Sequence, residues 1–198
     1  MLPFNYQYEQ SAVIYRILAQ ADTQYSSWLH ENGYLLHERK RFKLFCYSPF
    51  IFEKVRPLPE AGCLKIIGER AVWYISFIPE KSTLEFIQGI FAHQSFTIGN
   101  KKYQVAFDVV GVEAMSMPQL TEQMAFQAMS PICVKLHEDN KTQYLSPDNP
   151  MFADGILKGL KARYESIHGQ TFDMNDKEFS FELTDNKVKS KLITIKAN

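Results

Sequence analysis

The sequence lacks the short motifs that mark the common metal, nucleotide and serine-hydrolase sites. Its 198 residues contain no HExxH, no CxxC, no P-loop and no GxSxG. No two of the five histidines have the spacing of metal ligands together with a carboxylate partner. The histidines are His30, His37, His93, His137 and His168. These absences predict a protein with neither a metal site nor a cofactor.

Long apolar runs and paired cysteines are also missing. No apolar run reaches the roughly 20 residues that a membrane helix needs, so no membrane association is expected. The three cysteines, Cys46, Cys63 and Cys133, are scattered and odd in number. Their spacing fits neither a zinc site nor a disulfide framework, and we therefore expect a protein of the reducing cytoplasm.

The sequence has no excess of either charge, because 22 Lys and Arg residues balance 22 Asp and Glu residues. This balance argues against nucleic-acid binding, since phosphate contacts come from Lys and Arg. The basic residues nevertheless gather in two places, at Arg39, Lys40, Arg41 and Lys43, and at Lys187, Lys189, Lys191 and Lys196. Each cluster fits either a solvated surface or an RNA contact.

Two helices separated by a break are expected near the N-terminus. Residues 11–20 have apolar residues near helical spacing, at Val13, Ile14, Ile17 and Leu18. Asp22 is a good N-cap for a second short helix, which would end at Gly33. A third helix is expected over residues 79–92. Its apolar side would be formed by Leu84, Ile87, Ile90 and Phe91.

Strand patterns surround the third predicted helix. Residues 42–52 are rich in Phe, Tyr and Ile and predict one strand. Residues 63–78 predict a hairpin that turns at residues 68–70, and residues 96–112 predict another that turns at Gly99-Asn100. The order of helix, strand, strand, helix and strand pair matches a βαββαβ ferredoxin-like unit without its first strand.

The second half of the chain predicts part of another such unit. A strand over 129–136 precedes a turn and a helix over 150–167, and alternating strands follow over 179–185 and 188–196. This order of strand, helix, strand and strand is the first half of a ferredoxin-like unit.

The predicted fold class is therefore α+β. It has tandem ferredoxin-like (RRM-like) βαββαβ units, antiparallel sheets with helices on one face, and its first and last elements missing. Residues 1–116 would form an N-terminal domain that carries the candidate catalytic residues. Residues 117–128 would form a linker, and residues 129–198 an incomplete C-terminal domain.

Five short motifs occur in a distinctive order along the chain. They are P-x-N-Y-x-Y at 3–8, Ile14-Tyr15, Leu29-His30, K-L-F-x-Y-S at 43–48 and Ser130-Pro131-Ile132. In this order and at these distances they resemble the CRISPR-associated endoribonuclease that cuts repeat RNA into guide units. This is the sixth CRISPR-associated (Cas) family, built from paired ferredoxin-like RNA-recognition folds.

The resemblance implies an active site and a reaction. The family's catalytic tyrosine, histidine and lysine match Tyr15, His30 and Lys43 of this sequence. The implied reaction needs no metal, because the ribose 2′-hydroxyl attacks the adjacent phosphate and leaves a 2′,3′-cyclic phosphate and a 5′-hydroxyl. The implied substrate is CRISPR repeat RNA, as pre-crRNA or crRNA. The sequence leaves open which group acts as base and which as acid.

The spacing of the candidates sets a geometric condition. Tyr15 and His30 are 15 residues apart, about 22 Å along one straight helix, which is too far for both to touch one phosphate. The break near Asp22 must therefore turn the chain. Lys43 is expected on a strand where it shares a face with Phe45 and Tyr47, a cation beside aromatic rings. The predicted RNA-binding residues are His37, Arg39, Lys40, Arg41, Phe45, Tyr47, Lys187, Lys189 and Lys191.

The sequence departs from the family's usual pattern at both ends. Family members begin with a strand before the Pro-x-Asn-Tyr motif and end with a glycine-rich loop, and neither is present here. We therefore expect the catalytic residues without part of the RNA-binding surface. Open sheet edges would permit pairing with another chain, so a homodimer or contacts with other CRISPR-associated proteins are expected partners.

Two alternatives to the endoribonuclease remain open from sequence. The first is a non-catalytic RNA-binding module of the same fold that retains crRNA in an effector complex. The second is a ferredoxin-like protein-interaction domain without RNA, which the zero net charge favours.

Overall fold

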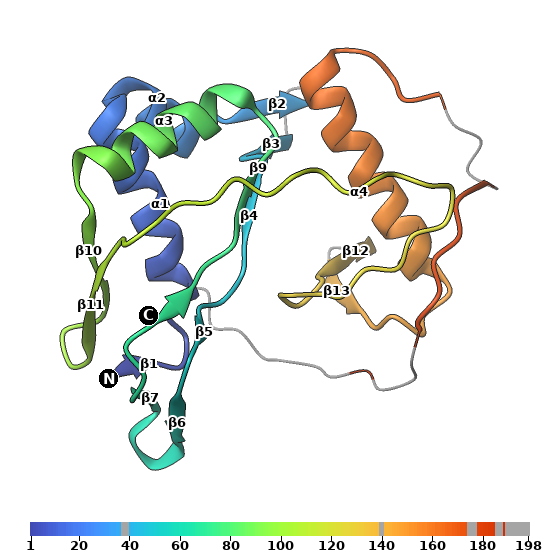
Figure 1. Cartoon of the computed structure of the whole chain (residues 1–198). Coiled ribbons are helices and arrows are strands. Elements are labelled where there is room, and N and C mark those ends of the chain that lie inside the picture. The colour runs from blue at the N-terminus through green and yellow to red at the C-terminus, as the bar shows by residue number, and fades with distance from the viewer. Residues whose placement is uncertain (37–39, 139–140, 174–177, 185–187, 189–198) are drawn as a thin grey trace. The chain divides into compact units, whose positions relative to one another are not determined.

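A computed structural model describes the chain in two compact units. The described residues are all except 37–39, 139–140, 174–177, 185–187 and 189–198. Of the described residues, the first unit comprises Met1–Glu31 and Leu44–Leu120, and the second comprises Asn32–Lys43 and those between 121 and 188. Each unit combines helix with short antiparallel strands (Figure 1). The predicted domain boundaries at residues 116 and 129 remain a prediction.

The first unit opens with two helices that meet at a corner. Helix α1 (Gln7–Ala21) buries the four apolar residues that the sequence predicts, together with Gln10. Helix α1 ends at Asp22, whose backbone is extended. One carboxylate oxygen of Asp22 accepts a hydrogen bond from the Tyr25 amide at 2.8 Å. This is the N-cap of α2 (Thr23–Glu31), so the predicted break between the helices is confirmed.

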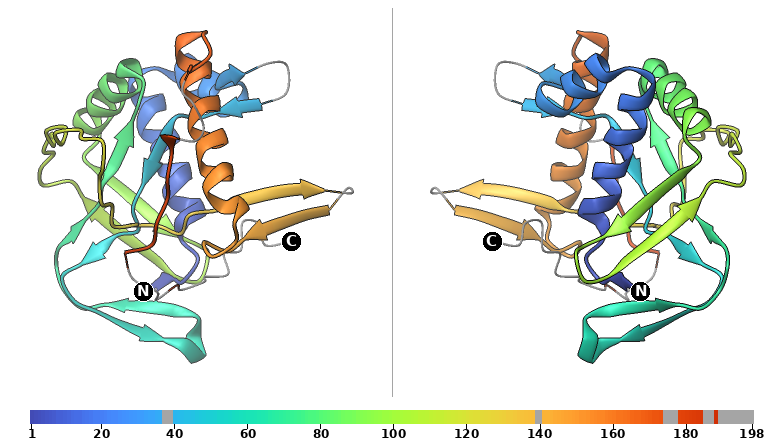
Figure 2. Two further views of the ribbon diagram at one scale, coloured as in Figure 1. Left: turned by 90° about the vertical axis from the view of Figure 1, so that its right-hand side faces the viewer. Right: turned by 90° about the vertical axis from the view of Figure 1, so that its left-hand side faces the viewer.

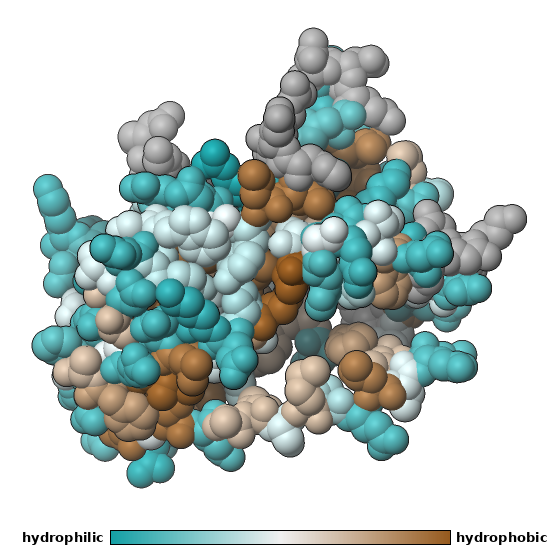
Figure 3. Space-filling model, turned by 90° about the horizontal axis from the view of Figure 1, so that it is seen from above, coloured by the Kyte–Doolittle hydropathy of each residue, from teal (hydrophilic) through white to brown (hydrophobic). Residues whose placement is uncertain are grey.

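Helix α3 (Glu80–Ala92) forms where the sequence predicts it, but it buries a different face. Its buried residues are Ser82, Phe86, Gly89 and Ile90, whereas the predicted Leu84 and Phe91 are exposed. The reason is close packing on α1, because a side chain at Gly89 would collide with the backbone of Ile17. Seen from above, the surface shows apolar side chains among hydrophilic ones (Figure 3).

The strands of the first unit form one long, interrupted antiparallel ribbon. The pairs are β4 (Phe45–Tyr47) with β9 (Ile75–Phe77), β5 (Ile51–Phe52) with β8 (Ala71–Val72), and β6 (Val55–Leu58) with β7 (Cys63–Ile66). The ribbon turns in a 3-10 helix at Pro59–Ala61, followed by left-handed Gly62. This end of the ribbon lies far from α2 and α3 (Figures 1 and 2).

Two strand predictions are therefore wrong. Residues 42–52 contain the last residue of β3 and the two short strands β4 and β5 rather than one strand, and the ribbon does not turn at 68–70. Residues 67–70 instead lie opposite Glu53 and Lys54, where Ile67 and Gly68 both donate to the Lys54 carbonyl and Glu53 donates to the Arg70 carbonyl. Pro59 and left-handed Gly62 supply the backbone geometry of the true turn.

The remaining strands of the first unit flank this ribbon. Where the sequence predicts no first strand, buried Leu2 and Pro3 form the short strand β1 (Leu2–Pro3), which pairs with β7. The predicted hairpin near residue 100 is confirmed as β10 (Ser95–Gly99) and β11 (Gln104–Asp108). Asn100 closes its turn by accepting hydrogen bonds from two following backbone amides at 2.9 Å.

The second unit contains two hairpins and one long helix. The hairpins are β2 (Tyr34–Leu36) with β3 (Lys40–Phe42), and β12 (Val134–Glu138) with β13 (Lys141–Leu145). The helix α4 (Met151–His168) confirms the predicted helix at 150–167. The core of this second unit is formed by Val134, Leu145 and Phe152, with Leu136, Ile156 and Phe181 packed against them.

The strand predictions for this unit are only partly correct. Strand β12 begins later than residue 129, and β13 forms where only a turn was predicted. Leu145 is the one buried residue of β13, so its sequence lacks the alternation of apolar and polar residues that predicts a strand. Residues 179–184 form no strand, so that prediction is wrong. The predicted strand at 188–196 lies outside the described residues, apart from Val188. No helix in the described part of the chain has the length and apolarity of a membrane span.

Candidate functional site

The corner between α1 and α2 brings Tyr15 and His30 into ring contact. Their ring centroids are 4.9 Å apart and the rings are nearly perpendicular, at 85°. A second contact fixes the two helices at this point, because the Ser26 hydroxyl donates to the Tyr15 carbonyl at 2.7 Å. The turn of the chain that the 15-residue spacing requires is therefore present.

Tyr15 lies in a half-buried aromatic environment. Its ring meets Phe45 edge-on at 5.7 Å, and Phe45 in turn stacks on Tyr47 at 6.3 Å. Burial, and to a smaller extent the neighbouring Tyr47, raises the pKa of Tyr15 to about 12. The Tyr15 hydroxyl is therefore protonated at neutral pH and can donate a hydrogen bond, but it cannot serve as a preformed base.

His30 is exposed in the last turn of α2, directly after a fully buried anchor, Leu29. The anchor fixes the backbone, while the imidazole remains accessible to solvent and to a ligand. A histidine at a helix C-terminus also suits the partial negative charge there. The pair thus combines a restrained phenol with an imidazole that can exchange protons.

Lys43 is placed differently from the sequence prediction. It lies between β3 and β4 rather than on a strand, and the next residue, Leu44, has a left-handed backbone with φ 54°. The predicted shared face with Phe45 and Tyr47 is therefore wrong, because the left-handed residue interrupts the strand alternation. Burial lowers the pKa of the Lys43 ammonium, and the nearby Arg41 guanidinium lowers it further. The structure groups Lys43 with the second unit and Tyr15 and His30 with the first.

The predicted RNA-binding residues fall into three groups. Lys40 and Arg41 are exposed on β3. Phe45 and Tyr47 are half-buried on β4, where Phe45 contacts Tyr15 and the Tyr47 hydroxyl donates to the Gln7 carbonyl at 2.9 Å. The other predicted residues lie outside the described part of the chain: His37, Arg39, Lys187, Lys189 and Lys191.

Sequence reasoning missed the polar residues that support the pair. Ser26 precedes His30 by one helical turn, a spacing that could have suggested a shared face. Tyr25 and Ser82 hydrogen-bond through their hydroxyls although they are 57 residues apart, and no local pattern could reveal that contact. Among the described residues, no group of three or more His, Cys, Asp or Glu side chains could hold a metal ion.

Comparison with known proteins supports the resemblance. A family model for the N-terminal part of CRISPR-associated protein Cas6 matches residues 1–108, and a model for its C-terminal part matches residues 115–198. The chain is similar to CRISPR-associated endoribonuclease Cas6 1 of Methanocaldococcus jannaschii. The two are 28% identical over 200 residues, which cover 99% of this chain and 71% of that protein.

Solved structures agree with the sequence comparison. The product of a Cas6-related gene from Pyrococcus furiosus matches with a TM-score of 0.70 and 25% identity, over 87% of this chain and 67% of that one. A RAMP protein that binds different RNA substrates matches with a TM-score of 0.67 and 26% identity, over 86% and 67%. These neighbours confirm the predicted α+β class with tandem ferredoxin-like units. With family models matching both of its parts, the chain belongs to the Cas6 family of CRISPR-associated proteins.

Proposed function

We propose that this chain cleaves CRISPR repeat RNA into guide RNAs without a metal ion. The ribose 2′-hydroxyl attacks the adjacent phosphorus, the bond to the 5′-oxygen breaks, and the products carry a 2′,3′-cyclic phosphate and a 5′-hydroxyl. The observation that carries this proposal is the contact between the Tyr15 and His30 rings at 4.9 Å. The names of the relatives as CRISPR-associated endoribonucleases support the same reaction class.

The two rings would have different roles. His30 would transfer the proton, because histidine exchanges protons near neutral pH and this one is exposed. Tyr15 would donate a hydrogen bond that orients the reacting phosphate, since its pKa of about 12 keeps it protonated. We assign to Lys43 the charge that offsets the extra negative charge on phosphorus in the transition state.

The exposed cations on β3 fit the RNA backbone. Lys40 and Arg41 follow His30 by 10 and 11 residues in sequence and are exposed in the structure. Lysine and arginine side chains of this kind neutralise phosphates and make binding weaken with salt. We therefore assign these two residues to phosphate contacts that hold the repeat.

Metal independence gives the first testable prediction. Purified full-length chain should cleave its repeat RNA equally well in excess EDTA and in Mg²⁺, because RNA supplies the nucleophile and the protein supplies proton transfer. Mass spectrometry of the products should find 2′,3′-cyclic phosphate and 5′-hydroxyl ends. Loss of cleavage in EDTA, or 5′-phosphate ends, would contradict this chemistry.

Replacing the Tyr15 hydroxyl gives the second prediction. Tyr15→Phe should slow single-turnover cleavage by roughly 10- to 100-fold, since one hydrogen-bond donor to the reacting group is lost. The pH dependence of the remaining rate below pH 9 should be unchanged, because the phenol does not ionise there. A changed profile in that range would show that Tyr15 itself titrates during the reaction.

The same substitution changes stability at high pH. Because burial raises the pKa of Tyr15 from 10.0 to about 12, its contribution to stability is present below pH 10 and is lost as the pH rises toward 12. The unfolding free energy of wild type should therefore fall more steeply over pH 10–12 than that of Tyr15→Phe. Urea unfolding at several pH values measures this difference.

A non-catalytic RNA-binding module is the second candidate function. The observation that favours it is the similarity to a solved RAMP protein that binds different RNA substrates. Tight repeat binding without cleavage at any pH between 6 and 9 would support this candidate over the endoribonuclease.

A further inference from the structure

Helix α2, which ends one residue after His30, is joined to α3 by a buried pair of hydroxyl groups. Tyr25 is 6% exposed and Ser82 is fully buried, and their hydroxyls hydrogen-bond to each other. Ser82 lies in the first turn of α3, which packs against α1. The bond therefore ties the middle of α2 to a helix that is itself fixed in the core.

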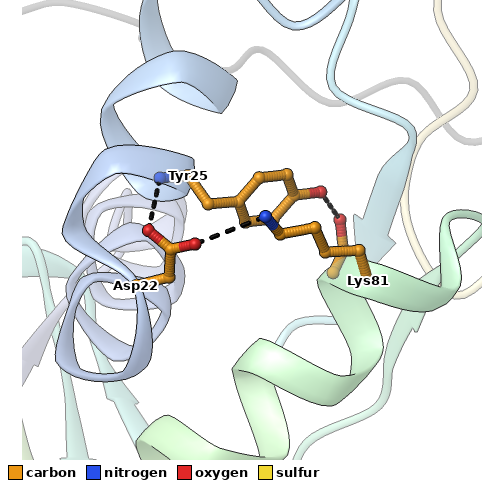
Figure 4. A network of polar contacts seen from close by, with 4 residues as sticks. Asp22, Tyr25 and Lys81 are labelled. Atoms are coloured by element: carbon orange, nitrogen blue, oxygen red, sulfur yellow. Dashed lines mark hydrogen bonds and ion pairs between the residues drawn. The ribbon is translucent and has the colours of Figure 1, made fainter.

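A charged contact supports the same junction from the surface. The Asp22 carboxylate caps α2 through the Tyr25 amide at 2.8 Å and also pairs with the Lys81 ammonium at 3.3 Å (Figure 4). The Lys81 ammonium lies 4.6 Å from the centroid of the Tyr25 ring. The Tyr25 amide, aided by Lys81, holds the pKa of Asp22 below its usual range, so the carboxylate remains charged.

The third contact reaches the catalytic pair itself. Ser26 lies one helical turn before His30, on the same face of α2. Its hydroxyl donates to the carbonyl of Tyr15, the residue whose ring meets His30. Two contacts, made by the consecutive residues Tyr25 and Ser26, thus set where the last turn of α2 lies relative to Tyr15.

We propose that Tyr25, Ser26 and Ser82 are positioning residues that hold the His30 imidazole against Tyr15. They touch neither the proposed substrate nor the reacting atoms, and their role in cleavage rests on the proposed function. Packing alone does not require hydroxyl groups here, because an apolar pair would fill the same space. A buried hydrogen bond between two hydroxyls instead fixes one orientation of α2 on α3.

The position of His30 can be measured without any RNA. In the full-length chain labelled on histidine and tyrosine, wild type should show strong ring-to-ring nuclear Overhauser effects between Tyr15 and His30. Ser82→Ala and Tyr25→Phe should each weaken them at least twofold, while resonances of the β10–β11 hairpin stay unchanged. If Ser82→Ala fails to fold, Ser26→Ala provides the same readout. Full-strength ring contacts in the folded variants would overturn the proposal.

A double variant separates positioning from general stabilisation. Each single variant breaks the hydrogen bond between Tyr25 and Ser82 from one end, which lowers stability, whereas Tyr25→Phe/Ser82→Ala removes both hydroxyls. The single variants should lower the urea concentration at the midpoint of unfolding, and we expect the double variant to reverse most of that decrease. Single-turnover cleavage should nevertheless stay roughly 10- to 100-fold below wild type, with RNA affinity within about twofold, because the orientation remains lost. Recovery of the ring contact and of cleavage together with stability would overturn the proposal.

Matched controls come from residues of the same types elsewhere in the first unit. Ser76 is exposed on β9 and Tyr74 is 39% exposed, and neither side chain contacts α2 in the described hydrogen bonds. Ser76→Ala and Tyr74→Phe should leave the ring contact and cleavage unchanged. If wild type does not cleave RNA at all, the proposed function fails, but the ring contacts still decide whether these residues position His30.

Discussion

His30→Ala should abolish cleavage of repeat RNA while leaving binding of that RNA intact. A positioned proton-transfer group contributes typically 10²- to 10⁴-fold to a rate, so single-turnover cleavage should fall by at least about 100-fold. The dissociation constant should change by less than about twofold, because the exposed imidazole is replaced without disturbing its buried neighbour Leu29. Both quantities can be measured with the same end-labelled RNA in EDTA.

The matched control is His93→Ala. His93 is also exposed and also ends a helix, where its backbone amide donates to the Gly89 carbonyl at 3.2 Å. Its side chain plays no part in the proposed site, so cleavage and binding should match wild type. An active His30→Ala, or an equal loss in His93→Ala, would show that the imidazole of His30 is not the essential group.

Gly89→Ala should strongly destabilise the first unit. A Cβ at this position would collide with the backbone oxygen of Ile17 on α1, and backbone cannot move aside as a flexible side chain can. Overpacking of this kind costs about 1–3 kcal/mol, and the better helix propensity of alanine recovers about 1 kcal/mol of it. Because the collision is with backbone, we expect the upper end of this range and hence a net loss of about 2 kcal/mol in the free energy of unfolding, measured by urea denaturation.

Gly111→Ala is the control for this substitution. A Cβ at Gly111 would meet nothing within 4 Å, and its backbone is not in the left-handed region. Its unfolding free energy should stay within about 0.5 kcal/mol of wild type. Equal stability of Gly89→Ala and Gly111→Ala would mean that α1 and α3 do not pack as closely as the structure shows.

Local chemistry explains which parts of the site were predictable from sequence. The corner between α1 and α2 follows from Asp22, whose short carboxylate caps the helix that begins directly after it. The distance between Tyr15 and His30 along the chain then requires that corner. This part of the geometry depends on neighbours in sequence, and it was predicted correctly.

The incorrect predictions share a different cause. The buried face of α3 is set by the close approach of α1 at Gly89, not by the apolar periodicity of α3 itself. The left-handed backbone at Leu44, which removes Lys43 from the strand, has no signature in a leucine. The contact between Tyr25 and Ser82 joins distant segments. Such features depend on tertiary packing, which overrides local propensity.

The central claim is that ionisation of His30, held against Tyr15, controls RNA cleavage. The most direct test compares the pH dependence of single-turnover cleavage in EDTA with the titration of the His30 ring followed by NMR in the same protein. We expect the two midpoints to coincide in wild type and in Tyr15→Phe. A rate profile that follows a different midpoint from the His30 titration would contradict the account.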